Sequence, residues 1–79
     1  MDGQQFLNLC IKKISKHTGV AKENILVVWS CKVLQNNKAL LGISGSNDAY
    51  YEFTYNGDKK ELYMDVYSKD HNVAFKNIE

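Results

Sequence analysis

The sequence predicts an α+β fold, in which one N-terminal helix packs on a four-stranded antiparallel meander sheet. Three observations lead to this fold class: an amphipathic stretch at the start of the chain, a nearly continuous β-branched and aromatic stretch after it, and two alternating stretches around an Asn-Gly pair. A chain of 79 residues, 44% of them hydrophobic, can build one small core. We therefore expect a single domain over residues 1–79.

The helix is expected from about residue 2 to residue 18. Asp2 is a suitable N-cap, and Gly19 stands where a left-handed C-cap is favoured. The apolar side chains of this stretch fall on one arc of the helical wheel, which should face the sheet: Phe6, Leu7, Cys10, Ile11 and Ile14.

Four strands are expected, with approximate limits at residues 25–34, 39–44, 49–55 and 61–67. The first strand is almost continuously apolar, which is typical of a central strand that is buried on much of both faces. We therefore expect Trp29 to belong to the core rather than to anchor a partner, and Cys31 to be inaccessible. The alternation ends near residue 69, so residues 69–79 are expected to form a C-terminal tail.

The last two strands flank Asn56-Gly57, the strongest short signal for a β-hairpin. A four-residue loop over 56–59 avoids placing Glu52 opposite Glu61, and it pairs Glu52 with Tyr63 and Phe53 with Leu62. The alternation also divides the side chains between two faces. Toward the helix we expect Tyr51, Phe53, Leu62, Met64 and Val66, and away from it Tyr50, Glu52, Thr54, Glu61, Tyr63, Asp65 and Tyr67.

Catalytic groups are sparse. Cys10 and Cys31 are expected to be reduced, buried hydrophobes. The chain's histidines, His17 and His71, show no zinc-ligand spacing, and Ser44 is not in a Gly-x-Ser-x-Gly motif. We expect no enzymatic activity, no cofactor and no metal. No apolar run reaches the roughly 18 residues of a membrane span, so we expect no membrane contact and an intracellular location.

The basic residues and the acidic sheet face argue against nucleic-acid binding. The net charge is +1, and all ten basic residues are lysines. Arginine is the usual reader of guanine edges and a favoured phosphate clamp. The acidic side chains on the outward sheet face would also repel a phosphate backbone. Tyrosines on an open sheet face can nevertheless stack bases, so a small nucleic-acid-binding accessory protein remains the alternative function.

The outward sheet face is the candidate partner-binding surface. Tyrosine buries a large ring while keeping a polar tip, and it is enriched at protein interfaces. The residues expected to bind a protein partner, or to form a homodimer interface, are Tyr50, Glu52, Tyr63, Asp65 and Tyr67. The other interpretation is a water-facing side with tyrosines chosen for strand propensity. The lysine-bearing helix face (Lys12, Lys13 and Lys16) is a second possible contact surface, although such a stripe is usually a solvated face.

Several short blocks carry a resemblance, and they fall in one order: Val27-Val28-Trp29-Ser30-Cys31-Lys32, Leu34-Gln35-Asn36, Lys38-Ala39-Leu40-Leu41, Tyr50-Tyr51-Glu52 and Thr54-Tyr55-Asn56-Gly57-Asp58-Lys59. With these blocks, residues 27–67 resemble an uncharacterised family of small proteins encoded by phages and prophages of Gram-positive bacteria such as staphylococci and streptococci. The family has no assigned activity, so the resemblance transfers no site residues.

The resemblance implies a setting, the cytoplasm of the host bacterium. Very small phage proteins without catalytic groups often act by binding a host protein. The expected function is therefore a phage-encoded protein-binding module that modulates or inhibits a host protein. Anti-CRISPR proteins and other inhibitors of host defence belong to this class.

Overall fold

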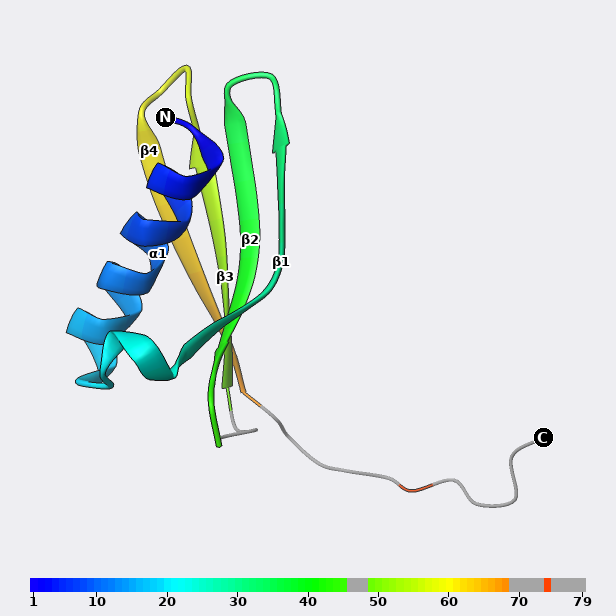
Figure 1. The fold of residues 1–79 in the computed structure, drawn as a ribbon. Coiled ribbons are helices and arrows are strands. Elements are labelled where there is room, and N and C mark those ends of the chain that lie inside the picture. The colour runs from blue at the N-terminus through cyan, green and yellow to red at the C-terminus, as the bar shows by residue number, and fades with distance from the viewer. Residues whose placement is uncertain (46–48, 69–73, 75–79) are drawn as a thin grey trace.

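The computed structural model describes residues 1–45, 49–68 and 74. The elements follow one another as α1 (Gly3–Thr18), the short 3-10 helix η1 (Lys22–Asn24), β1 (Ile25–Val33), β2 (Asn36–Ile43), β3 (Ala49–Asn56) and β4 (Glu61–Ser68). The strands form one antiparallel sheet in the order β1-β2-β3-β4, and α1 lies across one of its faces (Figure 1). The predicted α+β fold class is confirmed. Apart from Ala74, the expected tail lies outside the described residues.

Helix α1 has the two end signals that the sequence predicts. The Asp2 carboxylate accepts a hydrogen bond from the Gln5 amide at 2.8 Å, and the Gln5 side chain accepts one from the Asp2 amide at 2.9 Å. This capping box satisfies amides that the first turn would otherwise leave without partners. At the other end, Gly19 adopts the left-handed conformation with φ of 80°, and its amide bonds to the Ser15 carbonyl.

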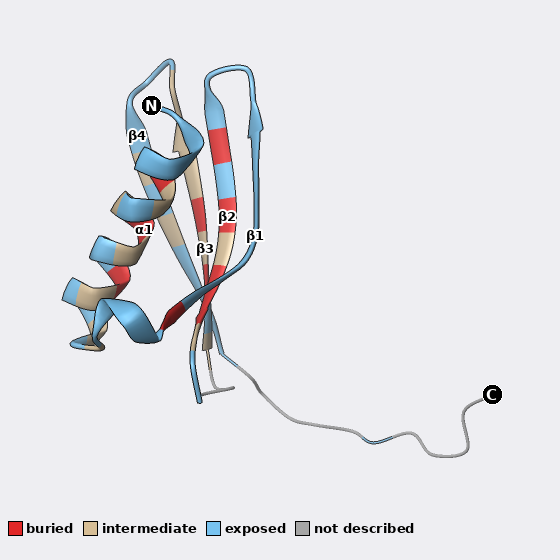
Figure 2. Cartoon of the chain, in the orientation of Figure 1, coloured by how far each residue is buried: buried red, intermediate tan, exposed pale blue. Residues whose placement is uncertain are grey.

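The core lies between α1 and the sheet, as the buried positions in Figure 2 show. It consists of every fourth side chain along one side of α1, alternate side chains of the two central strands, and one residue from the start of β1: Phe6, Cys10, Ile14, Ile25, Ala39, Leu41, Tyr51 and Phe53. Leu62 and Met64 of β4 are half-buried against it. The assignment of Tyr51 and Phe53 to the helix side is confirmed.

Strand β1 is not the central, doubly buried strand that the sequence suggests. Among the strands that the structure describes, it pairs with β2 alone, at an edge of the sheet, and after Ile25 all of its residues are exposed. The apolar run ILVVW would need cover on both faces, but α1 lies on one face only, and even on that side Val27 is 40% exposed. A β-bulge between Val27 and Trp29 also leaves Val28 outside the register with β2.

The register of β3 and β4 also differs from the expected one. Glu52 lies opposite Asp65 and Phe53 opposite Met64, whereas the sequence predicts Tyr63 and Leu62 as their partners. The strands pair as far as Asn56 and Glu61, which moves the loop to residues 57–60. Because the difference is two residues, every side chain stays on its expected face.

The two hairpin turns at one end of the sheet pack against each other. The β1–β2 turn is only Leu34 and Gln35, shorter than the four residues left between the expected strands 25–34 and 39–44. A Cβ on Gly57 would collide with the carbonyl oxygen and side chain of Gln35, and the Gly57 amide donates to Asn36 Oδ1 at 3.1 Å. Glycine is therefore needed at position 57 for close approach between the hairpins.

Candidate functional site

The sheet face opposite α1, called the open face below, carries all five residues predicted to bind a partner. Alternation from the buried Tyr51 and Phe53 directs their neighbours to this face. The register places Tyr50 opposite Tyr67 and Glu52 opposite Asp65, on β3 and β4. The Tyr50, Tyr63 and Tyr67 side chains are 43%, 47% and 53% exposed. The structure therefore brings the five residues together on one accessible surface.

Glu52 makes both an ion pair and a hydrogen bond on the open face. Its carboxylate lies 3.8 Å from Lys38 Nζ of β2, and it accepts a hydrogen bond from the Tyr67 hydroxyl at 3.3 Å. Lys38 offsets the repulsion expected between Glu52 and Asp65, which face each other across the strands. Ion pairs at this exposure contribute about 1 kcal/mol or less to stability, so they order the surface more than they hold the fold.

Two tyrosine hydroxyls on this face are coupled to carboxylates. The Tyr63 hydroxyl donates to Glu61 Oε2 at 2.6 Å, and this hydrogen bond, with desolvation and the Glu61 charge, raises the pKa of Tyr63. The negative charge of Glu52 is the main cause of a raised pKa at Tyr67. Because phenols ordinarily titrate near pH 10, both side chains stay protonated at neutral pH. They can donate hydrogen bonds but do not supply a base.

A second group of exposed side chains lies on the β1 side of the open face. The sequence analysis did not predict it. We call it the β1 strip: Leu26, Val28, Trp29, Cys31 and Val33. Trp29 is 41% exposed and lies opposite Leu40, and Leu26 lies opposite Gly42. The Tyr50 ring covers Gly42, where a Cβ would approach it to 3.4 Å. The β1 strip therefore continues through Tyr50 into the predicted surface.

A signal for the β1 strip was present in the sequence. One helix can cover only one face of a four-stranded sheet, so a strand that is apolar on both faces must expose one set of side chains. The prediction that Trp29 belongs to the core is accordingly wrong. The prediction that both cysteines are buried is right for Cys10 and wrong for Cys31. Cys10 is buried, and burial raises its pKa to about 12, whereas Cys31 is exposed, and neither forms a disulfide.

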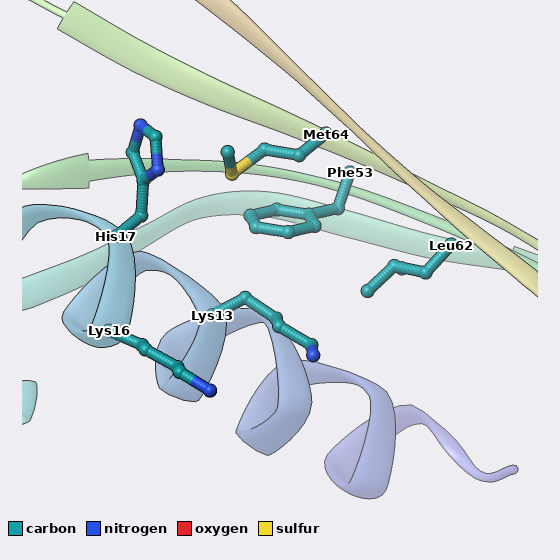
Figure 3. A pocket seen from close by; sticks show the side chains of 6 residues that line it. All are labelled: Lys13, Lys16, His17, Phe53, Leu62 and Met64. Atoms are coloured by element: carbon teal, nitrogen blue, oxygen red, sulfur yellow. The ribbon is translucent and has the colours of Figure 1, made fainter.

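A groove opens on the helix side of the sheet, between the C-terminal half of α1 and strands β3 and β4 (Figure 3). Its volume is about 400 Å³. Three residues of α1 and three apolar residues of the sheet line it: Lys13, Lys16, His17, Phe53, Leu62 and Met64. The predicted surface and this groove lie on opposite sides of the sheet.

A family of unknown function, DUF6275, matches residues 4–77, a range that includes all four strands and all of α1 except its first residue. The chain belongs to the DUF6275 family. The expectation of an uncharacterised family is thereby confirmed. The comparison with curated proteins found no match, and neither did the comparison with solved structures.

The described part of this DUF6275 chain was also compared with the requirements of a metal site and of a membrane-spanning helix. In the part of it that the structure describes, no group of three or more His, Cys, Asp or Glu side chains is arranged to hold a metal ion. Among residues 1–45, 49–68 and 74, neither helix has the length and apolar character needed to cross a membrane. His71 lies outside the described residues, whereas His17 lines the groove on the helix side.

Proposed function

We propose that this chain is a small protein-binding module whose contact surface is the open face. The observation that carries the proposal is the exposure of Trp29 within the β1 strip, which adjoins Tyr50. Single exposed apolar residues are ordinary, but a contiguous patch of them marks an interaction surface. Tryptophan and tyrosine are also the residues that most often dominate binding energy at protein interfaces.

The two halves of the open face have different roles in the proposed contact. The β1 strip and Tyr50 supply apolar area, which provides most of the affinity. Glu52 and Asp65, with Tyr63 and Tyr67 beside them, supply charge and hydrogen bonds that select the partner and its orientation. A partner would therefore combine an apolar centre with basic or hydrogen-bonding groups toward β4.

The proposed partner is a host bacterial protein. This part of the proposal rests on the resemblance of residues 27–67 to small proteins of phages and prophages of Gram-positive bacteria, and on the small size of the chain. In the cytoplasm of such a host, the module would modulate or inhibit its target by covering a functional surface. Anti-CRISPR or other anti-defence inhibition is the form of this activity that we propose. A homodimer through the same face is the competing use of the surface.

Binding of nucleic acid is a second candidate, favoured by one observation. Trp29, Tyr50 and Tyr63 are exposed rings on one sheet face, and such rings can stack unpaired bases. The acidic groups Glu52, Glu61 and Asp65 share that face and repel phosphates. The protein-binding function is therefore preferred.

Affinity capture tests the proposed function. Four proteins are immobilised and exposed to lysate of a Gram-positive host: the wild type, Trp29→Ala, Tyr50→Ala and Lys12→Ala. Lys12 lies on the exposed surface of α1, and its variant is the control. A captured protein is then purified and titrated against each variant. We expect Lys12→Ala to bind like the wild type, and the two aromatic variants to lose roughly 1 kcal/mol or more. Equal binding by all four proteins would contradict the proposed surface.

A salt titration separates the two candidate functions. Retention on single-stranded or double-stranded DNA that falls steeply between about 50 and 200 mM salt would favour the nucleic-acid function. Absence of retention at the lower salt concentration is the result expected for the protein-binding module.

A further inference from the structure

The groove on the helix side combines an apolar floor with a cationic rim. Phe53 is fully buried beneath it, and Leu62 and Met64 are half-buried. Figure 3 shows the side chains of Phe53, Leu62 and Met64 directed from the sheet toward α1, with the His17 ring on the same side of the groove as Met64. Lys13 extends from α1 toward Leu62. Both kinds of contact therefore meet in one concavity.

The rim charges have no acidic partner within the described residues. The ion pair in that part of the chain joins Lys38 to Glu52, on the other face of the sheet. Lys16 also stands in the last turn of α1, where a cation stabilises the helix dipole without any ligand. Lys13 lies one turn earlier, beyond the reach of that effect, and it still lines the groove.

We infer that this groove binds a small organic anion, with its carboxylate or phosphate head at Lys13 and Lys16 and its apolar body over Leu62 and Met64. A volume of about 400 Å³ lies within the usual range for small-molecule sites. The open face plays no part in this site, so the inference is independent of the proposed function.

Octanoate is the probe that tests the site, because it joins one carboxylate to a short apolar chain. The full chain, labelled with nitrogen-15, is titrated with octanoate, with octylammonium and with inorganic phosphate. We expect octanoate to shift the amide signals of Lys13, Leu62 and Met64 while leaving those of Trp29 and Tyr50 unchanged. Octylammonium should bind more weakly because the rim repels it, and phosphate should bind more weakly because it makes no contact with the floor.

Neighbouring lysines of α1 provide a matched pair of variants. Lys13→Glu reverses a charge on the rim, whereas Lys12→Glu makes the same change at an exposed residue that does not line the groove. We expect Lys13→Glu to weaken octanoate binding roughly tenfold, the equivalent of one charge-assisted hydrogen bond, and Lys12→Glu to leave it nearly unchanged. Met64→Gln, with its fold checked by circular dichroism, should weaken octanoate binding because it makes the floor of the groove more polar. It should not strengthen octylammonium binding.

Four results would overturn the inference. Octanoate could fail to shift the groove signals, or octylammonium could bind as tightly as octanoate. The Lys12→Glu and Lys13→Glu variants could lose equal affinity, which would indicate a general charge effect. An acidic peptide with apolar side chains could shift the groove signals where octanoate does not, and the groove would then be a docking site for protein.

Discussion

The two faces of the sheet use similar side chains in opposite ways. On the helix side, Tyr51 is 6% exposed and Phe53 is fully buried, whereas on the open face Tyr50 is 43% exposed and Trp29 is 41% exposed. Tyr50 and Tyr51 are neighbours in one strand, with the same side chain and the same backbone conformation. The difference between them comes only from the layer that covers each face, so residue type alone does not tell a core residue from a contact residue.

The neighbouring tyrosines give the largest expected contrast. Tyr51→Ala should lower the free energy of unfolding by about 3–5 kcal/mol, because it empties a position between α1 and the sheet. Tyr50→Ala should lower it by about 1 kcal/mol or less, since the ring is already in contact with water. Urea unfolding followed by circular dichroism measures both. Similar losses for the two variants would mean that the faces are not as different as their exposure indicates.

The two cysteines provide a chemical version of the same comparison. Cys10 lies in the core and its pKa is raised to about 12, whereas Cys31 lies exposed on the open face. In the native protein we expect a bulky disulfide reagent to label Cys31 at least about a hundredfold faster than Cys10, because the thiolate is the reactive form. Cys31→Ser should abolish the fast phase. Fast labelling that persists in this variant would place Cys10 within reach of solvent.

The raised pKa of Cys10 also predicts a pH dependence of stability. Below the ordinary thiol pKa of 9.0, the side chain is protonated in both the folded and the unfolded state. Between pH 9.0 and about 12, the unfolded chain loses this proton while the folded chain keeps it, so stability falls as the pH rises. Cys10→Ala, compared with the wild type across this range, should show a shallower fall.

Gly57 tests how tightly the two hairpin turns pack against each other at their end of the sheet. Gly57→Ala should cost about 1–3 kcal/mol of stability, because the new methyl group would collide with the Gln35 backbone. Gly3 is a suitable control, since a Cβ there meets nothing within 4 Å. Gly3→Ala should leave thermal unfolding unchanged or slightly raise its midpoint. A tolerated Gly57→Ala would show that the two hairpin turns can separate without loss.

The open face should show its own role in association. Tyr50→Ala and Tyr63→Ala should each weaken binding to a captured partner, or self-association, by roughly 1 kcal/mol, while folding stays nearly intact. Calorimetric titration and sedimentation measure the two processes. If both variants unfold while the folded fraction binds normally, these rings serve the fold and not a partner.

The smallest expected effect concerns one hydroxyl on the open face. The hydrogen bond to Glu61 is the main reason that the pKa of Tyr63 is raised, so Glu61→Gln should lower this pKa toward its ordinary value. Carbon-13 NMR of labelled tyrosine rings can follow the titration residue by residue, with Tyr67 as the internal reference. An unchanged Tyr63 titration would show that the Glu61 contact does not persist in solution.

Local patterns in the sequence were sufficient to predict much of the fold. Asp2 and Gly19 mark the ends of α1 because capping depends on residues within a few positions of each other. The alternation in residues 49–55 and 61–67 assigned each side chain of β3 and β4 to its face, because side-chain direction in a strand has a period of two. It placed Tyr50, Glu52, Tyr63, Asp65 and Tyr67 together even though the predicted register was two residues away.

Tertiary structure alone decided what each face meets. The apolar run of β1 has the composition of a buried strand, yet Trp29 and Cys31 are exposed because β1 lies at the sheet edge and α1 covers one face only. The groove at Lys13, Phe53 and Met64 likewise exists only after α1 docks, since its two walls are more than 35 residues apart in the sequence. Periodicity is a local property of the chain, whereas burial depends on which elements pack together, and that is determined across the whole fold.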